Sequence, residues 1–274
     1  MSGLAILFGC VVGFAMGLTG GGGGVFAVPL LVYALGIAPR EAVGISLAAV
    51  GGTALFGVAP RVLRKQVEFR TGLLFAVSGM IGAPVGAYLS TLVSEDLLLL
   101  MFGGLMLVVA WRMWAKARNP SLATGVCATE SQATRDRSAC QRDETGTLRL
   151  TSKCARLLVL VGLVTGILSG MFGVGGGFVI VPALVLFSGM EIHRAVGTSL
   201  FVIVLISISG VASYLLAGKQ LSVETTLLFL AGGFVGMWMG GVFAKRLSGT
   251  TLQKVFAGAV VFVAIFVISK SVIL

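Results

Sequence analysis

The chain of 274 residues has little charge, since only 11% of its residues are Asp, Glu, Lys or Arg, while 57% are hydrophobic. An average soluble domain carries about 25% charged residues. So few charges cannot cover the surface of a water-soluble globule, and the apolar content also excludes a disordered chain. The 40 glycines follow no G-X-Y period, which excludes a collagen-like fold. The composition favours a polytopic membrane protein.

Residues that bind metals are also scarce. There is one histidine, His193, and the four cysteines form no C-x-x-C pair. We therefore expect no zinc site and no cofactor, and we expect Cys10, Cys127, Cys140 and Cys154 to be reduced thiols with a structural role. No apolar segment contains H-E-x-x-H, G-x-S-x-G or a paired Asp, so an intramembrane enzyme is not favoured.

The net charge of +10 raises the possibility of nucleic acid binding, but no basic stretch is interleaved with aromatic residues. Lys and Arg gather in the cytoplasmic loops of membrane proteins, which explains the excess without nucleic acid. No Lys or Arg precedes Arg40, so the apolar N-terminal stretch is expected to be retained and not cleaved as a signal peptide. We expect a multi-pass protein of the cell inner membrane, surrounded by lipid and able to form a homodimer.

Six apolar stretches are about long enough to cross a ~30 Å hydrocarbon core as helices. They are Ala42–Leu63, Thr71–Val93, Leu97–Trp114, Ala195–Ala217, Thr225–Phe243 and the shorter Val255–Ser269. Residues 115–153 lie between the first three and the last three of these stretches and are rich in Ser, Thr and charged residues. We predict a first membrane repeat over 1–114, a polar cytoplasmic linker over 115–153, and a second membrane repeat over 154–274.

An internal repeat supports this division. At an offset of 153, 18 of the 39 positions between Gly9 and Leu47 are identical, including a shared glycine-proline pattern. In each half a glycine run cuts an apolar stretch into a segment of roughly 16–20 residues and one of about 12. The runs lie in Gly17–Pro29 and Gly170–Pro182. The fold class predicted is therefore an all-α membrane protein with two homologous halves, each opening with a re-entrant or broken helix.

Two topologies are possible, depending on whether each glycine-cut stretch crosses the membrane once. Parallel halves would put 15 of the 20 basic residues inside the cell. Inverted halves would put 17 inside and leave only Arg40, Lys219 and Lys270 outside. The positive-inside rule favours inverted repeats.

Three interpretations of the glycine runs are open. A nucleotide-binding loop is not favoured, because the flanking segments are long enough to cross a membrane and G-K-[ST] is absent. Close packing of helices explains the glycines that recur every four residues before each run. Neither explains consecutive glycines, which are poor helix formers and are tolerated in membranes where they are buried or line a cavity. Broken helices at matching places in two halves are typical of transporter sites, where free N–H groups bind anions.

The candidate binding residues are therefore the two runs and the hydroxyl side chains beside them. The hydroxyls could donate to substrate oxygens, although bonding back to the i−4 carbonyl is common for Ser and Thr in membrane helices. The set is Thr19, Gly20, Gly21, Gly22, Gly23, Gly24, Ser46, Gly173, Gly175, Gly176, Gly177, Thr198 and Ser199.

The paired glycine runs, each followed by a proline and then by A-V-G-I-S-L (Ala42–Leu47) or A-V-G-T-S-L (Ala195–Leu200), resemble the TauE/SafE family, also called DUF81 or TSUP. The resemblance covers nearly the whole chain outside 115–153. It implies an inner-membrane transporter of small sulfur-containing or carboxylated anions, with the site at the runs and at the neighbourhoods of Ser46 and Ser199. Many relatives carry Asn or Lys near the A-x-G-T motif, where this chain has Ile45-Ser46 and Thr198-Ser199.

We therefore expect a secondary transporter that exports a small anion, sulfite or an organosulfonate, by alternating access. An anion channel on the same scaffold and proton- or cation-coupled anion uptake are the alternatives. A membrane protein that assembles other proteins and transports nothing is a further one.

Overall fold

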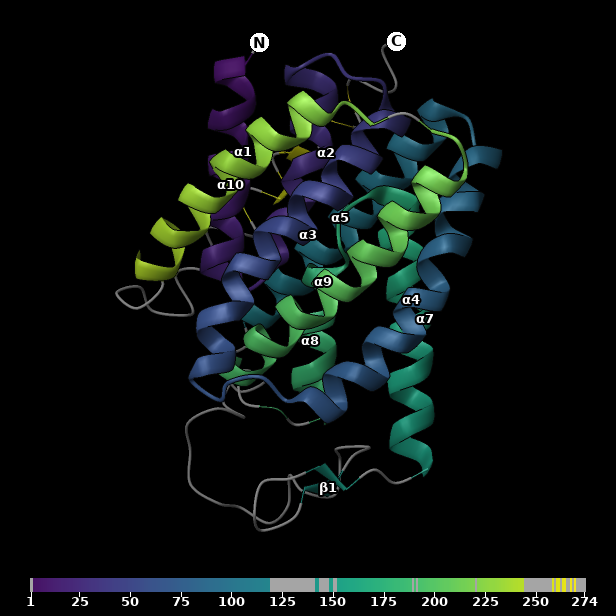
Figure 1. Cartoon of the computed structure of the whole chain (residues 1–274). Helices are drawn as coiled ribbons and strands as arrows, with labels where there is room; N and C mark the ends of the chain where they lie inside the picture. The colour runs from purple at the N-terminus through teal and green to yellow at the C-terminus, as the bar shows by residue number, and fades with distance from the viewer. Residues whose placement is uncertain are drawn as a thin grey trace.

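The computed structural model describes residues 2–118, 141–142, 148–149, 152–188, 190, 192–219, 221–243 and single positions between 258 and 269. Apart from the short antiparallel strands β1 (Gln141–Arg142) and β2 (Leu148–Arg149), its elements are helices (Figure 1). Six of the described helices are long and apolar enough to cross a membrane. The prediction of an all-α polytopic membrane protein is confirmed.

The first half contains four long helices: α1 (Ser2–Thr19), α3 (Pro39–Leu63), α4 (Phe69–Leu92) and α5 (Glu95–Arg118). Three short helical segments join α1 to α3: the 3-10 helix η1 (Gly22–Phe26), α2 (Ala27–Pro29) and the π-helix η2 (Leu30–Ala34). The second half contains α7 (Ser152–Phe172), α8 (Gly177–Ser188), α9 (Ile192–Leu216) and α10 (Val223–Phe243).

Both glycine-cut stretches break at the runs, as predicted. α1 ends at Thr19 just before the first run, and α7 ends at Phe172, before α8 begins at Gly177. The predicted helix over Val255–Ser269 and most of the linker over 115–153 lie outside the described residues.

Local sequence explains where several helices begin and end. Pro39 stands in the first turn of α3, where its missing N–H needs no partner. Ser222 precedes α10, and the backbone N–H of Thr225 donates to its hydroxyl oxygen at 3.5 Å. After α3 and α9, the equivalent positions Lys65 and Gly218 have left-handed φ angles of 56° and 72° and turn the chain.

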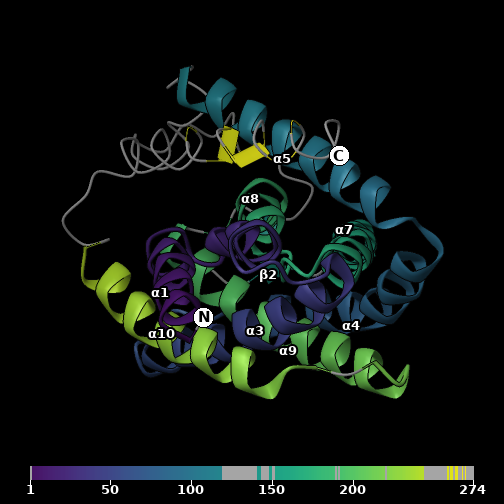
Figure 2. The ribbon, with the colours of Figure 1, turned by 90° about the horizontal axis from the view of Figure 1, so that it is seen from above.

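Helices of each half pack against helices of the other half (Figures 1 and 2). α1 of the first half packs on α10 of the second, and α7 of the second packs on α4 of the first. Glycines allow both approaches, since a Cβ added at Gly13 would lie 2.8 Å from the Cα of Gly233, and one at Gly166 would lie 2.7 Å from the Cα of Gly79. α3 and α9 cross between these pairs, while α5 lies at the edge of the bundle (Figure 2).

One prediction about the cysteines is wrong. Cys10 is a free thiol, but Cys154 is disulfide-bonded, and its partner lies outside the described residues. The absence of a C-x-x-C pair could not reveal this bond, because distant cysteines pair according to the fold.

Candidate functional site

The glycine runs adopt backbone conformations that other residues rarely take. Gly20 and Gly21 have φ angles of 75° and 117°, and Gly173, Gly175 and Gly176 have φ angles between 67° and 72°. Residues with a Cβ avoid this left-handed region. Both runs are buried. The first run differs from the expectation in one respect, because Gly22–Gly24 already belong to the 3-10 helix η1.

The two runs lie against each other. A Cβ added at Gly24 would lie 2.5 Å from the carbonyl oxygen of Val174, and one at Gly177 would lie 2.6 Å from that of Gly21. The offset of 153 that relates the halves turns the first contact into the second. Because Gly24 and Gly177 have no side chain, two backbone segments, one from each half, lie in direct contact.

Two equivalent serines connect each half to the run of the other. The Ser46 hydroxyl of α3 donates to the carbonyl oxygen of Gly173 at 2.6 Å, and the Ser199 hydroxyl of α9 donates to that of Gly20 at 2.7 Å. Ser199 also has the Val196 carbonyl within 2.9 Å. Both serines are fully buried. Both hydroxyls thus donate to the run of the opposite half. The sequence predicted instead a bond to substrate oxygens or to the i−4 carbonyl.

The two candidate threonines are bonded elsewhere. Thr19 donates to the Ala15 carbonyl at 2.7 Å, which is the i−4 bond considered as the alternative. The Thr198 hydroxyl oxygen accepts a hydrogen bond from the backbone N–H of Glu68 at 3.0 Å and so connects α9 to the start of α4.

Several N–H groups of the runs have no backbone acceptor. Gly20 and Gly21 donate to the carbonyl of Met16, Gly24 donates to Gly21, and Gly173 donates to Ser169. Within the described part of the chain, no backbone acceptor faces the N–H groups of Gly22, Gly23, Gly175, Gly176 and Gly177. Buried N–H groups almost always have a partner, because leaving one unpaired costs free energy. The runs therefore offer donors from both halves to a ligand that accepts hydrogen bonds.

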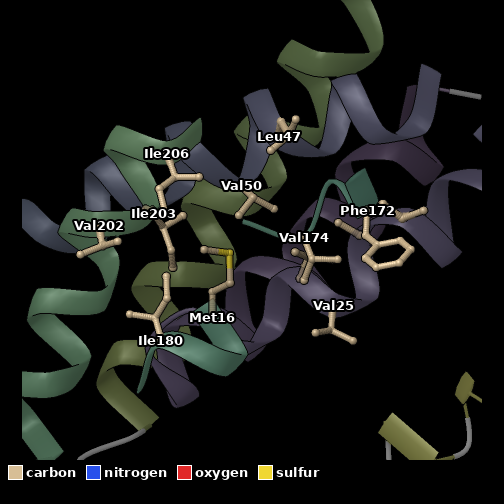
Figure 3. Close-up of a cluster of buried hydrophobic side chains, with 14 of the residues drawn as sticks. Met16, Val25, Leu47, Val50, Phe172, Val174, Ile180, Val202, Ile203 and Ile206 are labelled. Atoms are coloured by element: carbon tan, nitrogen blue, oxygen red, sulfur yellow. The ribbon is translucent and has the colours of Figure 1, made fainter. Parts of the chain in front are cut away.

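Apolar side chains enclose the meeting point of the runs (Figure 3). Val50 of α3 and Ile203 of α9 occupy equivalent positions at the offset of 153. A Cβ added at Gly175 would lie 2.9 Å from Val50 Cγ1 and 3.1 Å from Ile203 Cγ2. Both side chains are buried. Neither residue belongs to the set of binding residues predicted from the sequence, although the repeat offset relates the two.

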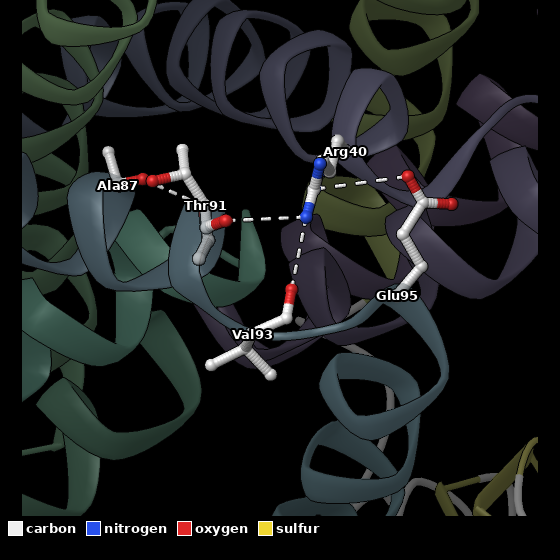
Figure 4. A network of polar contacts seen from close by, with 6 residues as sticks. Arg40, Ala87, Thr91, Val93 and Glu95 are labelled. Carbon is white, nitrogen blue, oxygen red and sulfur yellow. Dashed lines mark hydrogen bonds and ion pairs between the residues drawn. The ribbon is translucent and has the colours of Figure 1, made fainter.

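Basic residues lie at the end of the bundle where α3 begins. The guanidinium of Arg40 donates to the carbonyl of Val93 at 3.1 Å and to that of Thr91 at 3.4 Å, and lies 3.9 Å from the carboxylate of Glu95 (Figure 4). Lys219, in the turn after α9, has its ammonium 5.1 Å from the ring centre of Tyr214. Burial, together with repulsion from Arg40, lowers the pKa of Lys219.

None of the described residues forms a group of three His, Cys, Asp or Glu side chains that could hold a metal ion. The polar chemistry of the buried region described above therefore consists of backbone N–H groups, carbonyls and hydroxyls.

The chain is similar to membrane transporters over almost its whole length. It is 35% identical to a "Probable membrane transporter protein" of Xylella fastidiosa strain Temecula1, over 96% of this chain and 93% of the relative. It is 27% identical to the "Probable membrane transporter protein YunE" of Bacillus subtilis, over 87% and 85%, and 29% identical to a "Probable membrane transporter protein" of Haemophilus influenzae, over 96% of each chain. No solved structure matches the chain.

The family model described as "Sulfite exporter TauE/SafE" matches residues 5–267. This match includes both glycine runs, both serines that connect them, and all six helices that can cross a membrane except the first residues of α1. The chain belongs to the sulfite exporter TauE/SafE family of membrane transporters.

Proposed function

We propose that this protein exports small anions, sulfite or organosulfonates, across the cell inner membrane. The anion binds where the two glycine runs meet, and access alternates between the two sides of the membrane. The observation that carries the proposal is the contact between two buried runs that together present five N–H groups without backbone acceptors. Each half supplies some of these donors.

Backbone donors suit an anion that must be released again. An N–H group carries only a partial positive charge, so it replaces the hydration of an anion without the large desolvation cost of a buried Lys or Arg. No Asp, Glu, Lys or Arg occurs in Gly13–Tyr33 or in Leu157–Met190. A binding site without a fixed charge would favour an anion that leaves as readily as it enters.

The membrane potential gives the direction of transport. An inside-negative potential is worth about 2.3 kcal/mol per charge per 100 mV. An anion that moves without a coupled ion is therefore driven outward, whereas uptake needs a proton or cation partner. Export is the direction that requires no further component.

We also propose that the halves are inverted repeats with the linker in the cytoplasm. Support comes from the opposite directions of α1 and α7 in Figure 1, one running away from the N-terminus and the other away from the strand pair. Under this topology 17 of the 20 basic residues lie on the cytoplasmic side. Since α1 packs on α10 and α7 on α4, each moving unit would contain helices of both halves. A homodimer stays a prediction.

Purified protein in liposomes tests the proposal. Sulfite flux should saturate with concentration and should increase when the potential is set to drive anions out of the compartment that contains them. Flux that is equal at zero and at large potential would contradict electrogenic transport. Replacement of Gly24 or Gly177 by Ala should abolish flux, because the added Cβ separates the runs, whereas Gly104→Ala has open space and should not.

The same liposomes distinguish the alternatives. Single-channel currents without saturation would favour an anion channel, and flux that requires a proton or cation gradient would favour coupled uptake. A protein that moves none of sulfite, sulfoacetate, taurine, sulfate and thiosulfate would contradict transport of this class of anion.

A further inference from the structure

Ser169 carries a buried hydroxyl that no other described residue contacts through a hydrogen bond. It stands in the last turn of α7, it has 0% of its surface exposed, and its Oγ has no hydrogen-bond partner among the described residues. Ser46, Ser78, Ser90 and Ser199 are also buried, and each donates to a backbone carbonyl. Ser169 thus differs from these serines in a region where an unpaired polar group is costly.

A methyl group would just fit beside Ser169, at Gly176. A Cβ added at Gly176 would have as its nearest neighbours the Thr165 carbonyl oxygen at 3.3 Å, Ile180 Cδ1 at 3.6 Å and Ser169 Cβ at 3.7 Å. The contact with the Thr165 oxygen is tight, and the other two are ordinary van der Waals contacts. At Gly24 and Gly177, by contrast, an added Cβ would collide with backbone. At Gly176 there is therefore room for about one carbon atom, and this position lies next to Ser169.

Besides the Thr165 carbonyl oxygen, which is an acceptor, the polar groups near Gly176 are hydrogen-bond donors. In the described part of the chain, the N–H groups of Gly175, Gly176 and Gly177 have no backbone acceptor, and the hydroxyl of Ser169 has no partner. A carboxylate, sulfite or sulfonate oxygen accepts several hydrogen bonds at once and would pair with them. The chemistry of the space therefore matches an oxyanion.

The first half lacks both features. The offset of 153 relates Ser169 to Met16, which is fully buried but carries a thioether that cannot donate. It also relates Gly176 to Gly23, where an added Cβ would lie 2.7 Å from the Ala15 Cβ and closer still to the Met16 backbone N. The two runs also differ in backbone, because Gly175 and Gly176 have left-handed φ angles whereas Gly22 and Gly23 belong to η1. A hydroxyl and room for a methyl group therefore lie beside the second run.

We propose that Ser169 is a substrate-binding residue whose Oγ donates a hydrogen bond to an oxygen of the transported anion. At the meeting point of the runs, the oxyanion head group then lies closest to the second run, beside Gly176. This inference rests on the proposed function, since it assigns part of the anion site to a residue outside the set predicted from the sequence.

The test compares the KM of sulfite flux in liposomes for wild-type protein and Ser169→Ala. A hydrogen bond to a charged group is lost, so KM should increase roughly tenfold or more, with an unchanged unfolding temperature. Ser207→Ala is the matched control, because Ser207 is also buried with an unpartnered hydroxyl but packs against Gly51 of α3. Its KM should stay within about twofold of wild type. Ser169→Thr keeps the hydroxyl and should keep most of the affinity.

A second pair of variants tests the space itself. Gly176→Ala fills it and should raise KM or abolish flux. Gly36→Ala imposes the same backbone strain, with a φ of 68° against 67°, but has nothing within 4 Å, so it should transport normally. Wild-type flux with an unchanged KM in Ser169→Ala would overturn this inference and leave the proposed function intact. Absence of wild-type flux for every anion would instead overturn the proposed function, and this inference with it.

Discussion

The Ser46 hydroxyl donates to the Gly173 carbonyl oxygen across 127 positions of sequence, at 2.6 Å and in a fully buried environment. The bond joins α3 of the first half to the glycine run of the second. The equivalent bond from Ser199 to Gly20 joins the halves in the reverse sense. These two bonds fix the runs relative to the crossing helices.

Replacing Ser46 by Ala should lower the free energy of unfolding by about 1–3 kcal/mol, since the Gly173 carbonyl is left buried and unpaired. The measurement is thermal unfolding of detergent-purified protein. Ser90→Ala is the control, because Ser90 donates to Ala87 within its own helix, where that carbonyl also has its ordinary helical partner. Equal losses in the two variants would show that the bond between halves has no special contribution.

The ridge glycines should tolerate no larger side chain. Gly13→Leu introduces a side chain where the backbone of Gly233 lies, so α1 cannot approach α10, and folded protein should be lost. The amount of monodisperse protein after extraction measures this. At Gly104 an added Cβ meets nothing within 4 Å, and Gly104→Ala should be neutral or stabilising by about 0.5–1 kcal/mol, because Ala favours a helix. A monodisperse Gly13→Leu variant at wild-type yield would contradict the close packing.

Inverted repeats predict that equivalent turns lie on opposite sides of the membrane. Arg64 and Ala217 are related by the offset of 153, and both are exposed at the ends of α3 and α9. In intact cells, a membrane-impermeant thiol reagent should label Ala217→Cys and should label Arg64→Cys only after permeabilisation. Labelling of the unsubstituted chain gives the background. Parallel halves would instead give both new cysteines the same accessibility.

Anion entry at the end of the bundle where Arg40 and Lys219 lie should depend on pH through Lys219. Its pKa is lowered by burial and by Arg40, so the ammonium loses its proton at a lower pH than an ordinary lysine. Raising the pH toward the usual lysine value of about 10.4 should therefore reduce anion influx from this side earlier than expected. Influx rates across this pH range measure the effect. Lys219→Arg stays charged and should remove the decline, whereas an identical decline in that variant would exclude Lys219 as its cause.

Much of the fold was predictable from local features. Low charge indicates a membrane protein because hydrocarbon excludes charges, and the span lengths follow from its thickness. The breaks at Gly20 and Gly173 were predictable because consecutive glycines do not sustain a helix. The disulfide at Cys154 was not predictable, since the spacing of cysteines says nothing about which of them come together.

The helices, their interruptions and the repeat that relates Gly24 to Gly177 are all predictable from the chain alone, because they depend on residue type and spacing. The packing of the helices, in contrast, places the runs in contact and lets Ser46 donate to the opposite run. It also leaves the Ser169 hydroxyl without a partner among the described residues. Partners of hydrogen bonds depend on which helices pack together. A serine hydroxyl in a helix can donate to a carbonyl of its own helix, donate to the other half, or remain available to a ligand. The residue type alone does not show which of these it does.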